Sequence, residues 1–278
     1  MDTQHKYEEY YIAFIDILGF QELSKTATCE DIYNIFKALK DNSHATLFYN
    51  SEDVSAFEHV QHYIMSDSIV LYIRTNIEEA FLALIGTCLR LQHSLLYRDN
   101  PILLRGGIAK GQLFIEGNII YGKGLTEAYQ IENTVSIYPR IVFSKALLLD
   151  AKQNNQSPKR KDWEGMFTRK DDDEFYFVHY LCTTYMRYFD DIPKCWHHAL
   201  TRCQSILDSC FNQSIREKYI WLKNYTIKEA ESMVYLLNGI TGGKEFLSYW
   251  KIQENASSKE MRKLLSEISI VNEENNNE

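Results

Sequence analysis

The first half of the chain alternates between strand-like and helix-like patterns of apolar and polar residues. Residues 9–17 are rich in β-branched and aromatic side chains, which is typical of a strand. Residues 31–40 repeat their apolar positions at helical spacing. Two further strand-like runs, 57–65 and 68–74, are separated by a short polar turn, which predicts a hairpin.

A long apolar segment and a second pair of strand-like runs follow this hairpin. Residues 76–97 predict a well-buried helix that ends before Pro101. Residues 102–122 hold glycines between apolar runs, which indicates a second hairpin with tight turns or bulges. A short helix over 124–134 and a strand over 139–144 close the series. The order β-α-β-β-α-β-β-α-β predicts an α+β fold, in which helices cover a mostly antiparallel sheet.

The second half of the chain is less regular. Residues 151–174 are polar and charged, which predicts a linker or a long loop. We predict one more strand over residues 175–181, and packing or dimerisation helices over residues from about 196 to 240. The Asn- and Glu-rich tail predicts disorder. We therefore expect a catalytic domain over 1–150 and a C-terminal extension over 151–278.

Composition and charge narrow the class of protein. Of 278 residues, 45% are apolar and 24% charged, which is enough to bury a full core. Thirty basic against 38 acidic residues give a net charge of −8, which disfavours broad binding to nucleic acids. No apolar run is long enough to cross a bilayer, and the first residues do not form a secretion leader. Six cysteines without paired spacing suggest no disulfide framework, so we expect a cytoplasmic protein. From the charge and the short apolar runs we expect no nucleic-acid and no membrane partner.

An acid interrupts the end of the first apolar strand. Asp16 lies within the run FIDILGF, and Asp67 lies at the tip of the first predicted hairpin. If the two strands are neighbours in the sheet, both carboxylates project at one edge, where two ionised acids repel unless a cation lies between them. Asp16, Asp67 and the carbonyl of Ile17 are therefore candidate ligands for a hard cation such as Mg²⁺ or Mn²⁺, with substrate phosphates and water completing its coordination.

The turn after this acid is a candidate phosphate site. Leu18, Gly19 and Phe20 lead into a predicted helix, and the N–H groups at the start of a helix can bind a triphosphate. A different interpretation needs no ligand: Asp16 caps the helix and Asp67 is an ordinary turn residue, because Asp is favoured in both places. Spacing alone leaves both interpretations open.

Several motifs, taken together, resemble those of class III nucleotidyl cyclases. The first metal-binding motif of that superfamily is similar to FIDILGF, its second metal-binding hairpin to YIMSDSIVLYI, and its third and fourth blocks to RGGIAKGQ and YGKGLTEAYQIE. Together with MSDSIV, LRGGIAKG, EAYQIE and YPRIVFS, these motifs most resemble the pyrimidine cyclases of the bacterial Pycsar antiphage system. The C-terminal extension of that family is similar to FYFVHYL and REKYIWLKNY, so that the resemblance covers most of residues 8–225.

The resemblance implies a ferredoxin-like, palm-type domain and a head-to-tail homodimer with its sites at the subunit interface. It implies that UTP or CTP is converted into the 3′,5′-cyclic monophosphate and pyrophosphate, with two Mn²⁺ or Mg²⁺ ions per site held by Asp16, Ile17 and Asp67. The cyclic nucleotide would then activate a separate effector protein that kills or arrests the infected cell. UTP is slightly favoured, on the expectation that uridylate members of the family are commoner.

Departures from the purine cyclases bear on the base and on the transition state. Purine cyclases carry a base-reading Lys four residues before the second metal Asp, where this chain has Tyr63. An aromatic ring can fill the space that a smaller pyrimidine leaves, and its hydroxyl can bond a base edge. In the fourth block, Thr126 stands where purine cyclases have Asn, and Gln130 where they have the Arg that stabilises the transition state.

The missing cation has several candidate replacements. Arg105 and Arg140 lie beside motif residues, and a guanidinium donates two parallel hydrogen bonds to a phosphate. We assign the catalytic role to Arg105 and substrate contact to Arg140, with Lys110 and Lys123 as further candidates. The competing interpretation of Arg105 is a strand-end residue paired with an acid.

Two other functions remain open. A catalytically silent nucleotide-binding module would explain the loss of the fourth-block Asn and Arg, although both metal acids are retained. A palm-type enzyme that joins two nucleotides would use the same pair of acids. Residues 195–203 (CWHHALTRC) lack the short paired spacing of a zinc site, and Asp171, Asp172 and Asp173 lack the alternating pattern of a calcium loop. We interpret these two segments as a helix face and a solvated loop.

Overall fold

The structure is a computed structural model that divides into two compact units, Met1–Cys182 and Thr183–Glu278. The predicted disordered tail and the last three residues of the predicted C-terminal helices lie outside the described residues. None of the described helices combines the length and the apolar content that a membrane-spanning helix needs. The described residues are 5–43, 56–98, 101–154, 163–182 and 191–237.

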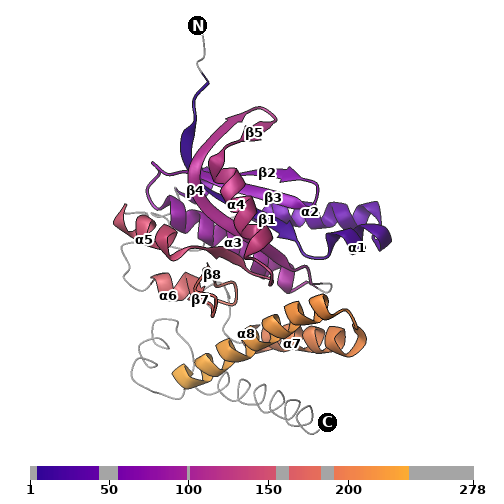
Figure 1. The fold of residues 1–278 in the computed structure, drawn as a ribbon. Helices are drawn as coiled ribbons and strands as arrows, with labels where there is room; N and C mark the ends of the chain where they lie inside the picture. The colour runs from indigo at the N-terminus through magenta and orange to yellow at the C-terminus, as the bar shows by residue number, and fades with distance from the viewer. Residues whose placement is uncertain (1–4, 44–55, 99–100, 155–162, 183–190, 238–278) are drawn as a thin grey trace. The chain divides into compact units, whose positions relative to one another are not determined.

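The described residues of the first unit form a mixed sheet of eight strands in the order β2-β3-β1-β4-β6-β8-β7, with β5 paired to β4 (Figure 1). The central strand β1 is antiparallel to both β3 and β4, and β2 is antiparallel to β3. This β2-β3-β1-β4 order is that of the ferredoxin-like βαββαβ unit, so the predicted α+β class is confirmed. The strands are β1 (Glu8–Ile17), β2 (Gln61–Met65), β3 (Ser68–Arg74), β4 (Leu104–Glu116), β5 (Ile119–Tyr121), β6 (Ile141–Phe143), β7 (Thr168–Lys170) and β8 (Tyr176–Val178).

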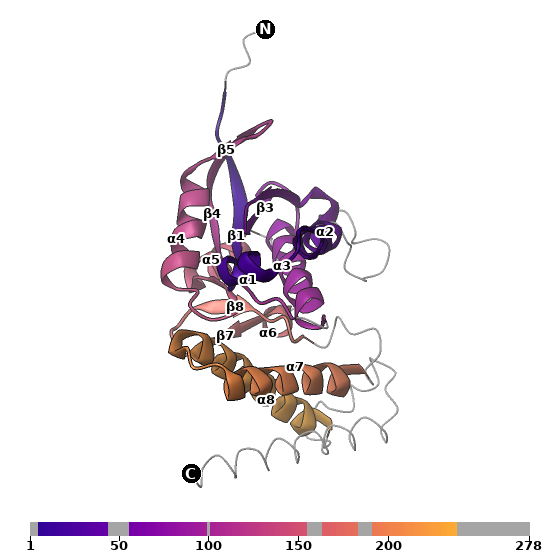
Figure 2. The same cartoon turned by 90° about the vertical axis from the view of Figure 1, so that its right-hand side faces the viewer.

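Helices cover both faces of this sheet. In Figure 2, α4 lies on one side of β1 and β4, and α2 and α3 lie on the other. The helix α3 is buried along most of its length, as its continuous apolar sequence predicts. The helices of this unit are α1 (Phe20–Thr26), α2 (Cys29–Ser43), the 3-10 turn η1 (Phe57–His59), α3 (Ala80–Leu96), α4 (Lys123–Thr134), α5 (Lys145–Gln153) and α6 (Trp163–Phe167).

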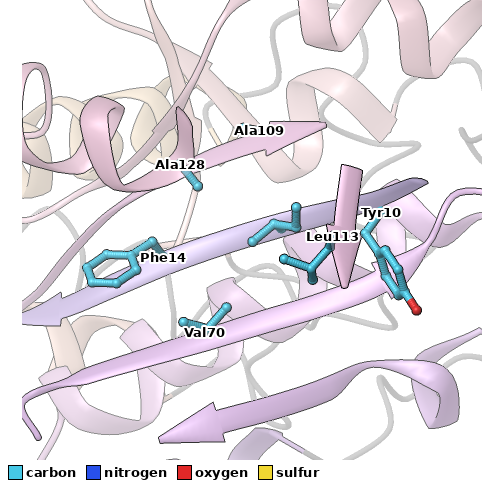
Figure 3. Close-up of a cluster of buried hydrophobic side chains, with 7 residues drawn as sticks. Tyr10, Phe14, Val70, Ala109, Leu113 and Ala128 are labelled. Carbon is cyan, nitrogen blue, oxygen red and sulfur yellow. The ribbon is translucent and has the colours of Figure 1, made fainter. Parts of the chain in front are cut away.

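The side chains of β1 point alternately to the two faces of the sheet. Successive side chains of a strand point to opposite sides, so that every second residue of β1 faces α4. The ring of Tyr11, from the other set, contacts Phe81 of α3 with ring centroids 5.2 Å apart. The residues on the α4 face form a buried apolar cluster, drawn in Figure 3, of Tyr10, Ile12, Phe14, Val70, Ala109, Leu113 and Ala128.

The linker predicted over 151–174 is wrong in part. Its described residues include the end of α5, the short helix α6 and the strand β7. Each of these elements is too short to produce a periodic pattern in the sequence. Through β8, β7 joins the sheet at β6, and Phe177 and Val178 are buried there. The first compact unit therefore extends to Cys182, beyond the boundary that we expected at residue 150.

The described residues of the second unit, 191–237, form two helices, in agreement with the helical prediction for this part of the chain. The helices α7 (Asp191–Ser209) and α8 (Gln213–Leu237) pack against each other. Trp196 and Cys203 of α7 and Leu222 of α8 are buried. Cys203 thus belongs to the buried face of a helix, which is the role that its sequence position predicts.

Candidate active site

Asp16 is the penultimate residue of β1, and its side chain lies on the face of the sheet that α4 covers. In the strand register it lies between Ser68 of β3 and Arg105 of β4. The helix α1 begins after Gly19, which has φ 78°, and no side chain caps its first turn. The interpretation of Asp16 as a helix cap is therefore wrong.

Asp67 lies in the turn between β2 and β3, directly before the residue that pairs with Asp16. The backbone N–H of Ile17 donates to the carbonyl oxygen of Asp67 at 3.2 Å, which ties this turn to the end of β1. The negative charge of Asp67 is close enough to raise the pKa of the Asp16 carboxyl group. The fold thus brings the two predicted acids together at one end of the sheet, while their role as metal ligands stays a prediction.

Arg105 bridges two carboxylates at this end of the sheet. Its Nε donates a hydrogen bond to Asp16 Oδ2 at 3.1 Å. One terminal nitrogen of Arg105 lies 2.8 Å from Oε1 of Glu132 in α4. These two atoms form an ion pair but not a hydrogen bond. The side chains of Asp16 and Glu132 are 18% and 4% exposed, and that of Arg105 is 25% exposed.

Burial raises the pKa of both acids. For Asp16 desolvation is the largest cause, the hydrogen bond and the charge of Arg105 oppose it, and the charge of Asp67 adds to it. For Glu132 desolvation again comes first, Arg105 opposes it, and the charges of Asp16 and Asp67 raise the pKa further. Among the described residues, the carboxyl groups of Asp16, Asp67 and Glu132 therefore lie near one another and near the Arg105 guanidinium. Each ionised acid there is favoured by a further cation.

Glycines in β4 allow α4 to approach closely enough to place Glu132 at Arg105. A Cβ atom on Gly107 would lie 2.3 Å from the carbonyl oxygen of Ala128 and 2.7 Å from the backbone nitrogen of Glu132. A Cβ atom on Gly111 would lie 2.8 Å from Cα of Gly124. The glycines that suggested a bulge in the sequence thus have a packing role, because only a hydrogen fits between the strand and the helix.

The donor atoms at this site fit a hard cation such as Mg²⁺ or Mn²⁺. Asp16 and Asp67 supply carboxylate oxygens, and the chain also offers the carbonyl oxygen of Ile17. Among the described residues, no group of three or more His, Cys, Asp and Glu side chains is arranged to hold a metal ion. Mg²⁺ is commonly bound through one or two carboxylates together with substrate phosphates, so the site would be completed by a nucleotide.

The other candidates near the acids are placed as follows. Leu18 N–H donates to the carbonyl oxygen of Leu103 at 2.9 Å, and Phe20 begins α1 with its ring 5.9 Å from that of Phe36. The Tyr63 ring packs against the apolar cluster on the α4 face. Its hydroxyl donates to the backbone carbonyl of Asn118 at 3.1 Å, in the turn between β4 and β5.

Thr126 and Gln130 are exposed on α4, and the structure brings neither to Asp16 by a hydrogen bond or an ion pair. The Thr126 hydroxyl donates to the carbonyl oxygen of Gly122 at 3.3 Å, within its own helix. Lys123 is exposed at the start of α4. Lys110 lies on the opposite face of β4 from Arg105, where it is paired with Asp150 at 2.9 Å.

Arg140 is buried, and its guanidinium is held by two carboxylates. The two terminal nitrogens pair with Asp171 and Asp173. Asp171 and Asp173 are therefore the acidic partners of a buried arginine. Asp172 and Asp173 are exposed, as the prediction of a solvated loop requires, whereas Asp171 is partly buried. Because both terminal nitrogens of Arg140 are paired with carboxylates, this arginine fits the role of an internal ion pair better than the substrate contact that we predicted.

Glu132 is the residue of this site that the sequence interpretation missed. It lies four positions after the buried Ala128 on the face of α4 that packs against β4. An acid on the buried stripe of an amphipathic helix needs a partner, which was the available signal. Sequence spacing did not reveal that this partner is Arg105.

Comparisons with known proteins give similar folds. No family model matches the sequence, and no curated protein matches it. The solved structures that resemble the fold include three cyclases. One is the monomeric guanylyl cyclase domain of the RhoGC fusion protein from the aquatic fungus Blastocladiella emersonii, with TM-score 0.47, 15% identity, and coverage of 64% of this chain and 98% of that chain.

The second is the catalytic core of a rhodopsin-guanylyl cyclase with converted specificity in complex with ATPαS, with TM-score 0.46, 14% identity, and coverage of 63% and 98%. The third is an adenylate/guanylate cyclase/hydrolase from Silicibacter pomeroyi, with TM-score 0.38, 15% identity, and coverage of 62% and 98%. At such scores and identities these likenesses carry no argument about activity or substrate.

Proposed function

We propose that the protein is a nucleotidyl cyclase that converts UTP, or else CTP, into the 3′,5′-cyclic monophosphate and pyrophosphate with the help of divalent cations. The observation that carries this proposal is the position of Asp16 and Asp67 at one end of the sheet, close enough for the charge of one to raise the pKa of the other. The motifs that resemble class III cyclases, and the ferredoxin-like strand order around β1, support it.

The residues of the site divide the chemistry between them. Asp16, Asp67 and the Ile17 carbonyl would hold Mn²⁺ or Mg²⁺, in two ions per site, and bound cations supply neutralisation of the phosphates and a lowered pKa of the ribose 3′-hydroxyl. Arg105 is partly exposed and can donate to a phosphate oxygen through its planar fork. Orientation contributes much of the rate, because the nucleophile belongs to the same molecule as the α-phosphate that it attacks.

Pyrimidine selection rests on Tyr63, and Thr126 and Gln130 are candidates for other contacts with the substrate. Tyr63 is partly buried at the edge of the apolar cluster, and its hydroxyl donates to a backbone carbonyl that a base edge could replace. Thr126 and Gln130 are exposed on α4, where they are accessible to a nucleotide or to a second subunit. A homodimer, and a product that acts on a separate effector protein in antiphage defence, belong to the proposal through the resemblance to the Pycsar family.

A second candidate is a catalytically silent nucleotide-binding module. The ion pair between Arg105 and Asp16 favours it, because a guanidinium already occupies a position beside the carboxylate that a cation would need. A module of this kind would bind a nucleoside triphosphate and release it unchanged.

Product analysis separates these functions. The purified full chain is incubated with Mn²⁺ and each of the four nucleoside triphosphates in turn, and the products are identified by mass spectrometry. We expect a cyclic mononucleotide from UTP, CTP or both, and none from ATP or GTP. Unchanged triphosphates with measurable nucleotide binding would support the silent module, and a dinucleotide would support a palm-type enzyme of another kind.

A further inference from the structure

Asp16 has a positively charged partner within its own protein. Arg105 Nε lies 3.1 Å from Asp16 Oδ2, and the two side chains are 25% and 18% exposed. A hydrogen-bonded guanidinium and a divalent cation are both attracted to the negative charge of the same carboxylate, and they repel each other. A cation that binds Asp16 therefore weakens the contact between Asp16 and Arg105.

Glu132 gives Arg105 a second partner that does not depend on Asp16. Its side chain is 4% exposed, and its Oε1 lies 2.8 Å from the terminal nitrogen of Arg105. The helix that carries Glu132 lies directly on β4, because the glycines of this strand leave room for its backbone. Leaving one member of a buried ion pair without its partner is costly. A guanidinium displaced from Asp16 would keep a carboxylate through Glu132.

We propose that Arg105 competes with the divalent cation for Asp16, and that Glu132 is the positioning residue that retains the Arg105 guanidinium at the site when a cation takes Asp16. This inference rests on the proposed function, since that function is what brings a cation to Asp16. In this arrangement the site changes between two states: Arg105 shared by Asp16 and Glu132, and Arg105 held by Glu132 with its other nitrogens turned to the substrate.

Lys110 provides a matched comparison on the same strand. It is also a β4 cation shared by two carboxylates, Asp150 at 2.9 Å and Glu9 at 3.4 Å. It lies on the opposite face of the sheet from Asp16, because it is an odd number of residues from Arg105. Removing its charge changes the net charge of the protein by the same amount without removing a competitor for Asp16.

The test is Mn²⁺ binding by the nucleotide-free full chain, measured as the electron paramagnetic resonance signal of free Mn²⁺ during a titration. We expect Arg105→Met to bind Mn²⁺ roughly three- to tenfold more tightly than the parental protein, because a charged hydrogen bond in a partly screened site is removed. Lys110→Met should stay within about twofold of the parental affinity. Arg105→Lys should lie between the parental protein and Arg105→Met, since one ammonium group cannot span both carboxylates.

A double-mutant cycle tests the role of Glu132. In the parental background, Glu132→Gln leaves Arg105 with Asp16 alone and should weaken Mn²⁺ binding roughly two- to fivefold. In the Arg105→Met background the same substitution should have little effect. An equal loss in both backgrounds would show that Glu132 acts on the cation directly, and would overturn its positioning role.

The outcomes separate this inference from the proposed function. If Arg105→Met binds Mn²⁺ no more tightly than Lys110→Met does, Arg105 does not compete with the cation for Asp16. The same conclusion holds if neither variant binds Mn²⁺ detectably. Tighter binding by Arg105→Met with no cyclic nucleotide from the parental protein upholds the competition and rejects the cyclase. Thermal unfolding of each variant confirms that the compared proteins are folded.

Discussion

Replacing Gly107 by alanine puts one methyl group into the contact between α4 and β4. The new Cβ would lie 2.3 Å from the carbonyl oxygen of Ala128, 2.7 Å from the nitrogen of Glu132 and 2.7 Å from Cβ of Ile131. Ordinary contacts of this kind are about 3.5 Å, so the helix must move by about 1 Å. Two of the three atoms belong to the backbone and cannot yield by a change of rotamer.

We expect Gly107→Ala to lower the free energy of unfolding of the first unit by about 1 to 3 kcal/mol, the usual cost of overpacking a close contact. For a unit of this size the melting temperature should fall by roughly 2 to 12 °C. The displacement also moves Glu132 away from Arg105, so Mn²⁺-dependent turnover should fall more than stability alone explains. Circular dichroism melting curves and a cyclisation assay at a temperature well below melting measure the two effects separately.

Gly165→Ala is the matched control, because it adds the same methyl group in α6, where a Cβ would have no atom within 4 Å. Its melting temperature should equal or slightly exceed the parental value, since alanine favours a helix over glycine. If Gly107→Ala and Gly165→Ala have the same melting temperature, then the backbone of α4 does not lie directly against Gly107 of β4. The placement of Glu132 at the site would then lose its support.

Three ionisable groups of the first unit lead to further predictions. Burial outweighs Arg105 in raising the pKa of Asp16, so its ionised form costs stability at neutral pH. Asp16→Asn should therefore melt higher than the parental protein at pH 7, and the difference should vanish as the pH falls to about 4; a lower melting temperature at pH 7 would contradict this. Burial lowers the pKa of His93 from 6.5 to about 4, so the unfolded chain takes up a proton over that interval that the folded chain does not. Because of His93, the free energy of unfolding should fall by up to about 3 kcal/mol on acidification, and His93→Leu should make this free energy depend less on pH. If urea titrations at several pH values give His93→Leu the same pH dependence as the parental protein, this prediction is refuted. Arg140→Met breaks a buried ion pair with Asp171 and Asp173 and should cost about 3 kcal/mol in the same assay; parental stability would show that the pair is dispensable.

Much of the first unit follows from local patterns in the sequence. The β-branched and aromatic residues over 9–17 predict β1, and the two strand-like runs around Asp67 predict the β2-β3 hairpin. The pairing of β1 with β3 was only a condition in the sequence interpretation, and the structure supplies it. The short elements α6 and β7 could not be predicted in the same way, since three to five residues do not establish a period.

Pairings between distant charged residues account for what the sequence did not reveal. Arg140 was expected at the substrate because of its motif, but its partners, Asp171 and Asp173, lie in a segment that resembles a solvated loop. Glu132 was overlooked because its partner, Arg105, is on another element. Which charges meet depends on helix placement, and that placement depends on contacts such as the one at Gly107.

Removing the Asp16 carboxyl group shows whether this residue acts with Asp67 in metal-dependent cyclisation. The rate of cyclic pyrimidine nucleotide formation is compared for the parental protein, Asp16→Ala and Asp172→Ala, an acid-to-alanine control in an exposed loop position. We predict that Asp16→Ala makes no cyclic product while it stays folded in the parental oligomeric state, and that Asp172→Ala keeps the parental rate. Turnover by Asp16→Ala at the parental rate would contradict the account.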